Sequence, residues 1–199
     1  MSQVFTSPPI LRLRTDPISL RSRVGRVTAR ELSVLAVAGG LAALAMAMVH
    51  LNLRIPGHAI LKPLLPLTFG LVLVPRRAAG CMIAVTAAAT TAVLAFGQWG
   101  ELQLPALTSL VLLGPALDLA ARGTHSKGAF LARFALAGCA VNLLAMGSRI
   151  VAMALGFSLG GGRGFAALWP FSLFSFVACG ALAGILSAAI CCYGPARNR

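Results

Sequence analysis

Polar side chains that could bind a solute gather in one segment of this largely apolar chain, from His50 to Lys62. Pro56 and Gly57 predict a turn near its centre, and the short apolar stretch that follows is interrupted by prolines. In an apolar environment, irregular backbone of this kind is tolerated only where it is packed in protein or lines a cavity. We therefore expect the polar side chains around the turn to bind a solute: Asn52, Arg54, His58 and Lys62. The alternative is an ordinary tight loop whose two cations reach lipid phosphates.

A second group of candidates lies on a later apolar stretch. Asn142, Met146, Arg149 and Met153 are spaced by four, three and four residues, which places them on one face of a helix. By helical rise, Arg149 lies about 24 Å from Arg133, in the outer part of a membrane. A guanidinium facing a cavity would bind a carboxylate or phosphate through its planar fork, whereas one facing lipid would extend to the headgroups. Both interpretations stay open for Arg149.

Two tryptophans belong to the same side of the protein. Trp99 and Trp169 are both expected near the outer face, where amphipathic indole rings favour the membrane interface. Simple anchoring and a contact with solute are equally compatible with this position.

The sequence offers no catalytic or metal-binding constellation. It has no paired carboxylates, no Ser/His/Asp grouping and no zinc-type spacing of ligands, and its three histidines are scattered. Asp118 precedes Arg122 by four residues, a spacing that favours an ion pair at the end of a helix. We expect neither an enzyme nor a resident metal or cofactor.

Composition determines the class of fold. Of the 199 residues, 58% are apolar and only 11% are charged, which is more apolar surface than a soluble fold of this size can bury. About 20 apolar residues cross a bilayer as a helix. The sequence predicts an all-α bundle of six transmembrane helices, at 33–53, 60–74, 78–99, 104–121, 129–157 and 165–193.

The basic residues predict the orientation of this bundle. With both termini in the cytoplasm, 13 of the 17 Lys and Arg residues lie on the cytoplasmic side, as insertion favours. The predicted organisation is a basic cytoplasmic tail at 1–31, a six-helix domain at 32–193 and a short cytoplasmic tail at 194–199. The arginine-rich first segment also fits an organellar targeting peptide.

The net charge of +13 would suggest nucleic acid as a partner in a soluble protein. Here the cations lie in the tail and in the connections between apolar stretches, without interleaved aromatic residues. The expected partner is therefore the lipid bilayer of the inner or plasma membrane, crossed several times, and not nucleic acid.

Three short strings resemble the substrate-binding S component of energy-coupling-factor (ECF) vitamin transporters. They are Ile55-Pro56-Gly57-His58-Ala59, the run from Leu73 to Gly80, and Ala116-Leu117-Asp118-Leu119. Six helices and a length near 200 residues agree, and the similarity covers residues 32–193. The resemblance implies a subunit that captures a vitamin-like solute and docks on a transmembrane coupling subunit, with two separate ATPase subunits supplying energy. The chain itself has no phosphate-binding loop of the Walker A type.

The family docks partly through small residues of its first helix. In this chain Ala38, Ala42, Ala43 and Ala47 give the corresponding spacing, which permits close helix approach. The predicted function is therefore the capture of a small anionic or zwitterionic solute for an ATP-driven importer. The alternative is a small structural or assembly membrane protein without a solute.

Overall fold

The computed structural model describes residues 27–49, 55–97, 104–122, 126–156 and 169–193, and every regular element in these ranges is helical. The α-helices are α1 (Ala29–Met48), α2 (Leu64–Leu73), α3 (Ala79–Phe96), α4 (Leu104–Ala120), α5 (Lys127–Ala154) and α7 (Trp169–Tyr193). A short 3-10 helix, η1 (His58–Leu61), precedes α2. In the described residues, the predicted all-α membrane bundle with six α-helices is confirmed.

Four of these helices are long and apolar enough to cross a membrane: α1, α3, α5 and α7. The other two apolar segments are shorter, at His58–Leu73 and Ala106–Ala120. The proline-interrupted second stretch thus forms η1 and α2 in place of one long span. The structure is that of a multi-pass membrane protein.

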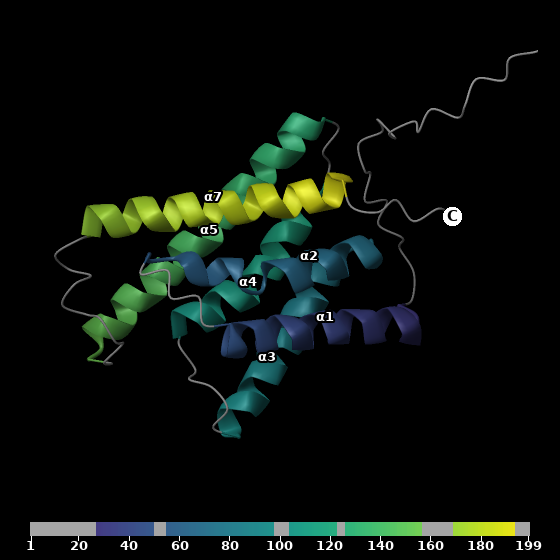
Figure 1. Ribbon diagram of the computed structural model, residues 1–199, viewed down its shortest axis with the longest axis horizontal. Helices are drawn as coiled ribbons and strands as arrows, with labels where there is room; N and C mark the ends of the chain where they lie inside the picture. The colour runs from purple at the N-terminus through teal and green to yellow at the C-terminus, as the bar shows by residue number, and fades with distance from the viewer. Residues whose placement is uncertain (1–26, 50–54, 98–103, 123–125, 157–168, 194–199) are drawn as a thin grey trace, which may run out of the picture.

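The long helices pack on one another in the order of the chain, and α2 lies against three of them (Figure 1). Helix α1 packs on α3, α3 on α4, α4 on α5 and α5 on α7, while α2 contacts α1, α3 and α7. Residues of η1 and α2 are accordingly among the most buried of the chain, such as Ile60, Leu64 and Leu67. One face of α2 therefore contributes to the core, whereas Leu65, Phe69 and Leu73 on α2 are 46–54% exposed.

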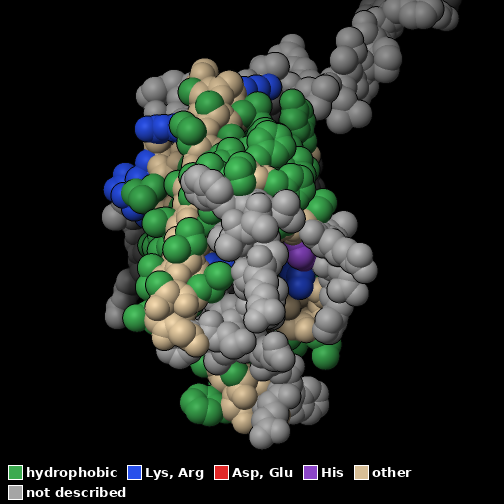
Figure 2. Space-filling model, turned by 90° about the vertical axis from the view of Figure 1, so that its left-hand side faces the viewer, with side chains coloured by type: hydrophobic (Ala, Val, Ile, Leu, Met, Phe, Trp, Pro, Cys, Tyr) green, Lys and Arg blue, Asp and Glu red, His purple; other side chains and the backbone are tan. Residues whose placement is uncertain are grey.

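Large apolar side chains also cover the outside of the bundle. Val37 on α1, Val85 on α3, Leu136 on α5 and Phe174 on α7 are each more than 60% exposed. Figure 2 shows hydrophobic side chains over much of the described face that it presents. Such a surface is unfavourable in water and matches a surround of lipid tails.

Glycines set the closest helix contacts. A Cβ atom on Gly138 of α5 would lie 2.1 Å from the carbonyl oxygen of Gly180 on α7, and one on Gly184 would lie 2.0 Å from that of Phe134. Gly80 of α3 and Gly114 of α4 meet in the same way. These backbones touch, and any side chain at the contact would separate the helices.

Local signals fix several helix starts. At α1, Thr28 and Glu31 form a capping box, so the helix begins four residues earlier than the apolar pattern alone predicts. Ser126 caps α5 through a bond from the Ala129 amide to its hydroxyl at 3.2 Å. Helix α3 instead begins after Ala78, whose φ of 67° places it in the left-handed region and whose side chain offers no cap.

Candidate functional site: a clamped turn and its cations

The turn predicted at Pro56 and Gly57 is present between α1 and η1. Gly57 has φ 84° and ψ −3°, the backbone of the third residue of a type II turn, and Pro56 stands at the preceding position that such turns favour. A Cβ atom on Gly57 would also lie only 3.0 Å from the Asn142 amide nitrogen and from Phe176. Both the backbone angle and the space therefore require glycine here.

Asn142 joins this turn to the two helices beneath it. Its Nδ2 group donates to the carbonyl of Phe176 on α7 at 2.7 Å and to the carbonyl of Gly57 at 3.2 Å. Both partners are acceptors, which fixes the orientation of the amide. The side chain is only 1% exposed, so the predicted solute ligand Asn142 is engaged in holding the turn.

Two further side chains hold the neighbouring carbonyls. The Ser175 hydroxyl, on α7, donates to the carbonyl of Pro56 at 2.6 Å. The His58 ring nitrogen Nδ1 lies 2.6 Å from the carbonyl oxygen of Ile55. Three consecutive carbonyls of the turn thus each pair with a side chain from a different element. We call His58, Asn142 and Ser175 the turn clamp.

The clamp holds irregular backbone well inside the bundle. Asn142 lies about 22 Å along α5 from its first residue, Lys127, and about 18 Å from its last, Ala154. At such a depth, backbone polar groups must find partners within the protein. The side chains of the clamp supply these hydrogen-bond partners, so the backbone of the turn is satisfied without being part of a strand or helix.

Two cations accompany the clamp. Lys62 is half-buried just after η1, and Arg149 is half-buried about 10 Å beyond Asn142 along the same face of α5. The Nε atom of Arg149 is buried. Figure 2 shows a histidine with a basic side chain beside it on one face of the molecule. These groups form the charged part of the candidate site.

The remaining predicted ligands are not brought to the clamp by any described contact. Asn52, Arg54 and Trp99 lie outside the described residues. Trp169 is the first residue of α7, six residues before Ser175, and only its backbone is described. Their contribution to solute binding stays a prediction.

The predicted docking face of α1 is occupied by the chain itself. Ala38, Ala42 and Ala43 are at most 7% exposed, and Ala42 packs in one cluster with Ala87 of α3 and Leu110 of α4. A Cβ atom on the adjacent Gly39 would lie 2.0 Å from Thr86 of α3. Ala47 is half-buried. The small residues make a close helix contact as expected, but the partner is internal.

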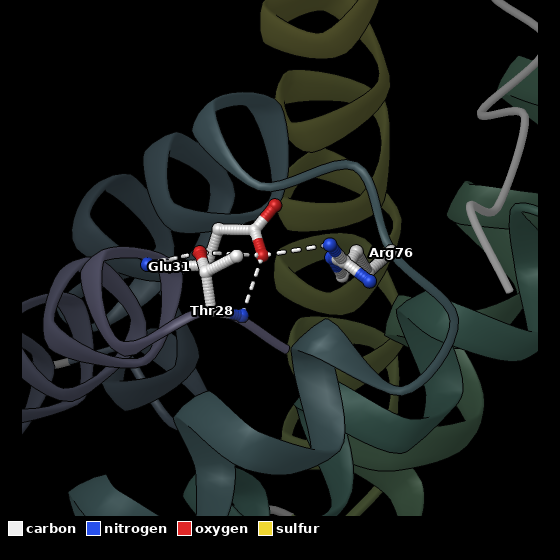
Figure 3. A network of polar contacts seen from close by, with 3 residues as sticks. All are labelled: Thr28, Glu31 and Arg76. Carbon is white, nitrogen blue, oxygen red and sulfur yellow. Dashed lines mark hydrogen bonds and ion pairs between the residues drawn. The ribbon is translucent and has the colours of Figure 1, made fainter. Parts of the chain in front are cut away.

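The opposite end of the bundle carries an ion pair. Arg76, between α2 and α3, lies 2.8 Å from the Glu31 carboxylate at the start of α1. The same Glu31 oxygen accepts from the Thr28 amide at 3.0 Å, which Figure 3 shows as one network. This network ties the first helix to the α2–α3 connection.

Asp118 has a role that the sequence did not predict. Its carboxylate accepts hydrogen bonds from the Gly80 amide at 3.0 Å and from the Cys81 amide at 2.9 Å, at the start of α3. Negative charge there stabilises exposed amides of a helix N-terminus. Asp118 thus caps a helix 38 residues away, a role that the spacing to Arg122 does not reveal.

The described residues hold no group of three or more side chains suited to a metal ion. The candidate site comprises the hydrogen-bonded turn with the cations Lys62 and Arg149. Comparisons with protein-family models, with curated proteins and with solved structures give no match to this chain.

Proposed function

We propose that this protein is the membrane-embedded capture subunit of an ATP-driven importer of the ECF type, taking up a small vitamin-like solute. The observation that supports the proposal is the turn at residues 55–58, held inside a membrane bundle by side chains from three elements. Membrane proteins tolerate such backbone where it is packed in protein or lines a cavity for a solute.

The charges near the clamp suggest which solutes would fit. Lys62 and Arg149 are half-buried cations, and an arginine fork pairs with carboxylate or phosphate oxygens. The proposed solute is therefore an anionic or zwitterionic organic molecule. Arg54, Trp99 and Trp169 remain candidates for further contacts with it.

Energy would come from other subunits. The sequence lacks a Walker A loop, so ATP hydrolysis requires separate ATPase subunits and a transmembrane coupling subunit. Cytoplasmic ATPases and capture from outside imply the inner or plasma membrane, with both termini in the cytoplasm.

A second candidate is a structural or assembly membrane protein without a solute. The burial of Ala38, Ala42 and Ala43 against the chain's own helices favours it, because the face expected to dock on a coupling subunit is already filled. Under the importer hypothesis, docking would use another face, or α1 would separate from α3.

Isolation of the tagged protein with its membrane partners, followed by ATP-dependent uptake in proteoliposomes, tests the proposal. A coupling subunit and two ATPases in stoichiometric amounts would support the importer.

Replacing Arg149 by Ala should lower solute affinity about 10- to 150-fold, the equivalent of about 1.5–3 kcal/mol for a hydrogen bond to a charged group. Arg149→Lys should restore only part, because an ammonium lacks the planar fork. Isolation without ATPases and without uptake would favour the assembly protein.

A further inference from the structure

The bond between His58 and Ile55 fixes the protonation of one ring nitrogen. A backbone carbonyl only accepts hydrogen bonds, so the Nδ1 atom 2.6 Å from it must carry the hydrogen. In the neutral imidazole the other nitrogen, Nε2, then holds a lone pair and acts as an acceptor. The turn itself thus selects one tautomer of His58.

The rest of the clamp leaves Nε2 available. Ser175 and Asn142 donate to other carbonyls of the turn, and the described contacts give the His58 ring no second hydrogen bond. The ring is half-buried and so not enclosed by the protein. A fixed acceptor on an otherwise satisfied turn is suited to a ligand that carries a donor.

Charges around His58 are positive. Lys62 follows it by four residues, is half-buried, and has no ion pair among the described residues. The two acidic residues that the structure describes are used elsewhere, Glu31 by Arg76 and Asp118 by the start of α3. No described carboxylate offsets the charge of Lys62.

We infer that His58 accepts, through Nε2, a hydrogen bond from an N–H or O–H group of the captured solute, while Lys62 binds an anionic group of the same molecule. This inference rests on the proposed function and narrows its substrate class to organic anions that also carry a hydrogen-bond donor. Anions without a donor leave Nε2 unpaired and bind less well.

Nitrogen NMR of the full chain in nanodiscs tests the first step. In a His50→Gln/His125→Gln background, ¹⁵N-labelled histidine reports on His58 alone. At a pH at which the spectrum shows the neutral ring, the expected result is a hydrogen on Nδ1 and a bare Nε2. The opposite tautomer overturns the inference whatever the protein transports, so this measurement is independent of the importer hypothesis.

A matched pair of probes tests the second step. We expect 4-hydroxybenzoate, which combines a carboxylate with an O–H donor, to shift the Nε2 resonance, and benzoate to leave it unchanged. Equal responses to the two probes, or none to either, overturn the assignment of His58 as an acceptor for solute.

Two substitutions separate the roles of the two nitrogens. His58→Asn places an amide donor near the position of Nδ1, so it should preserve the turn and abolish discrimination between the probes. His58→Gln places its amide near the position of Nε2, so it should retain part of the discrimination while weakening the turn. Discrimination that survives in His58→Asn at the wild-type level contradicts the inference. Thermal unfolding of the same samples shows whether each variant keeps its fold, and discrimination is compared only between variants that do.

Discussion

The amide of Asn142 and the carbonyl of Gly57 lie 3.2 Å apart although 85 residues separate them in the chain. This bond fastens the turn between the first two helical segments to the middle of α5. Asn142 also donates to Phe176 at 2.7 Å, so a single side chain joins three parts of the bundle. A polar residue within a predicted span thus positions the site and does not by itself identify a ligand.

Substitution of Asn142 should reveal this positioning role. Asn142→Ala removes both donated bonds and should lower the free energy of unfolding by about 1–3 kcal/mol. Asn142→Asp has the same shape but sets a carboxylate oxygen against two carbonyls, so it should be more destabilising than Ala. Thermal unfolding in detergent measures both variants. An Asp variant as stable as the wild type would show that the amide does not donate here.

The contact between α5 and α7 gives a second prediction. Gly180→Ala sets a methyl group 2.6 Å from the carbonyl oxygen of Gly138, and overpacking of this kind costs about 1–3 kcal/mol. Gly147→Ala on α5 is the matched control, because a Cβ atom there meets nothing within 4 Å. It should stabilise the helix by up to about 1 kcal/mol. Equal effects of the two changes on thermal unfolding would contradict the close backbone contact.

The sequence predicted the helices well because apolar length is a strong local signal. It also contained the α5–α7 contact, since Gly180 and Gly184 form a GxxxG motif in an apolar helix. The close helix contact was predicted instead from the alanine-rich spacing of the first helix. In so alanine-rich a segment, small residues recur at this spacing by chance. The sequence alone therefore does not show which of the two motifs, the glycines of α7 or the alanines of α1, makes a close helix contact.

The turn clamp and the Asp118 cap were beyond local sequence patterns. The polar segment around His58 and the residue Asn142 were both identified, but their hydrogen bond depends on how α5 and α7 are placed against the turn. Ser175 carried no signal of its own, as one of several serines in apolar helices. Asp118 was interpreted through its neighbour Arg122, whereas its partners lie at the start of α3.

The Asp118 cap predicts a specific loss of stability. Asp118→Ala leaves two amides at the start of α3 without their acceptor, and the loss of a helix cap costs about 0.5–2 kcal/mol. Asp118→Asn keeps one acceptor oxygen, so it should lower the free energy of unfolding by less than Asp118→Ala does. Hydrogen exchange of the Gly80 and Cys81 amides is the direct measurement, and we expect faster exchange in the Ala variant. Unchanged protection of both amides would contradict the cap.

The internal α1 contact changes what a bulky residue at position 42 should do. Ala42 is fully buried against α3 and α4, so Ala42→Leu should destabilise the isolated protein by about 1–3 kcal/mol. Ala36→Leu, at an exposed position of the same helix, is the control and should leave unfolding unchanged. An Ala42→Leu protein that keeps its stability yet loses its partner subunits would return this face to the docking role.

The orientation of the bundle gives the last prediction. Thirteen of the 17 basic residues fall on one side if both termini are cytoplasmic, and insertion retains Lys and Arg in the cytoplasm. The segments 97–103 and 156–164 then lie outside, and the segment around His125 lies inside. In intact cells, a membrane-impermeant thiol reagent should label Gly100→Cys and leave His125→Cys unlabelled until the membrane is permeabilised. The wild-type protein, with its five native cysteines, sets the background for both measurements. Labelling of His125→Cys in intact cells would reverse the orientation, and with it the prediction that Arg149 lies in the outer part of the membrane.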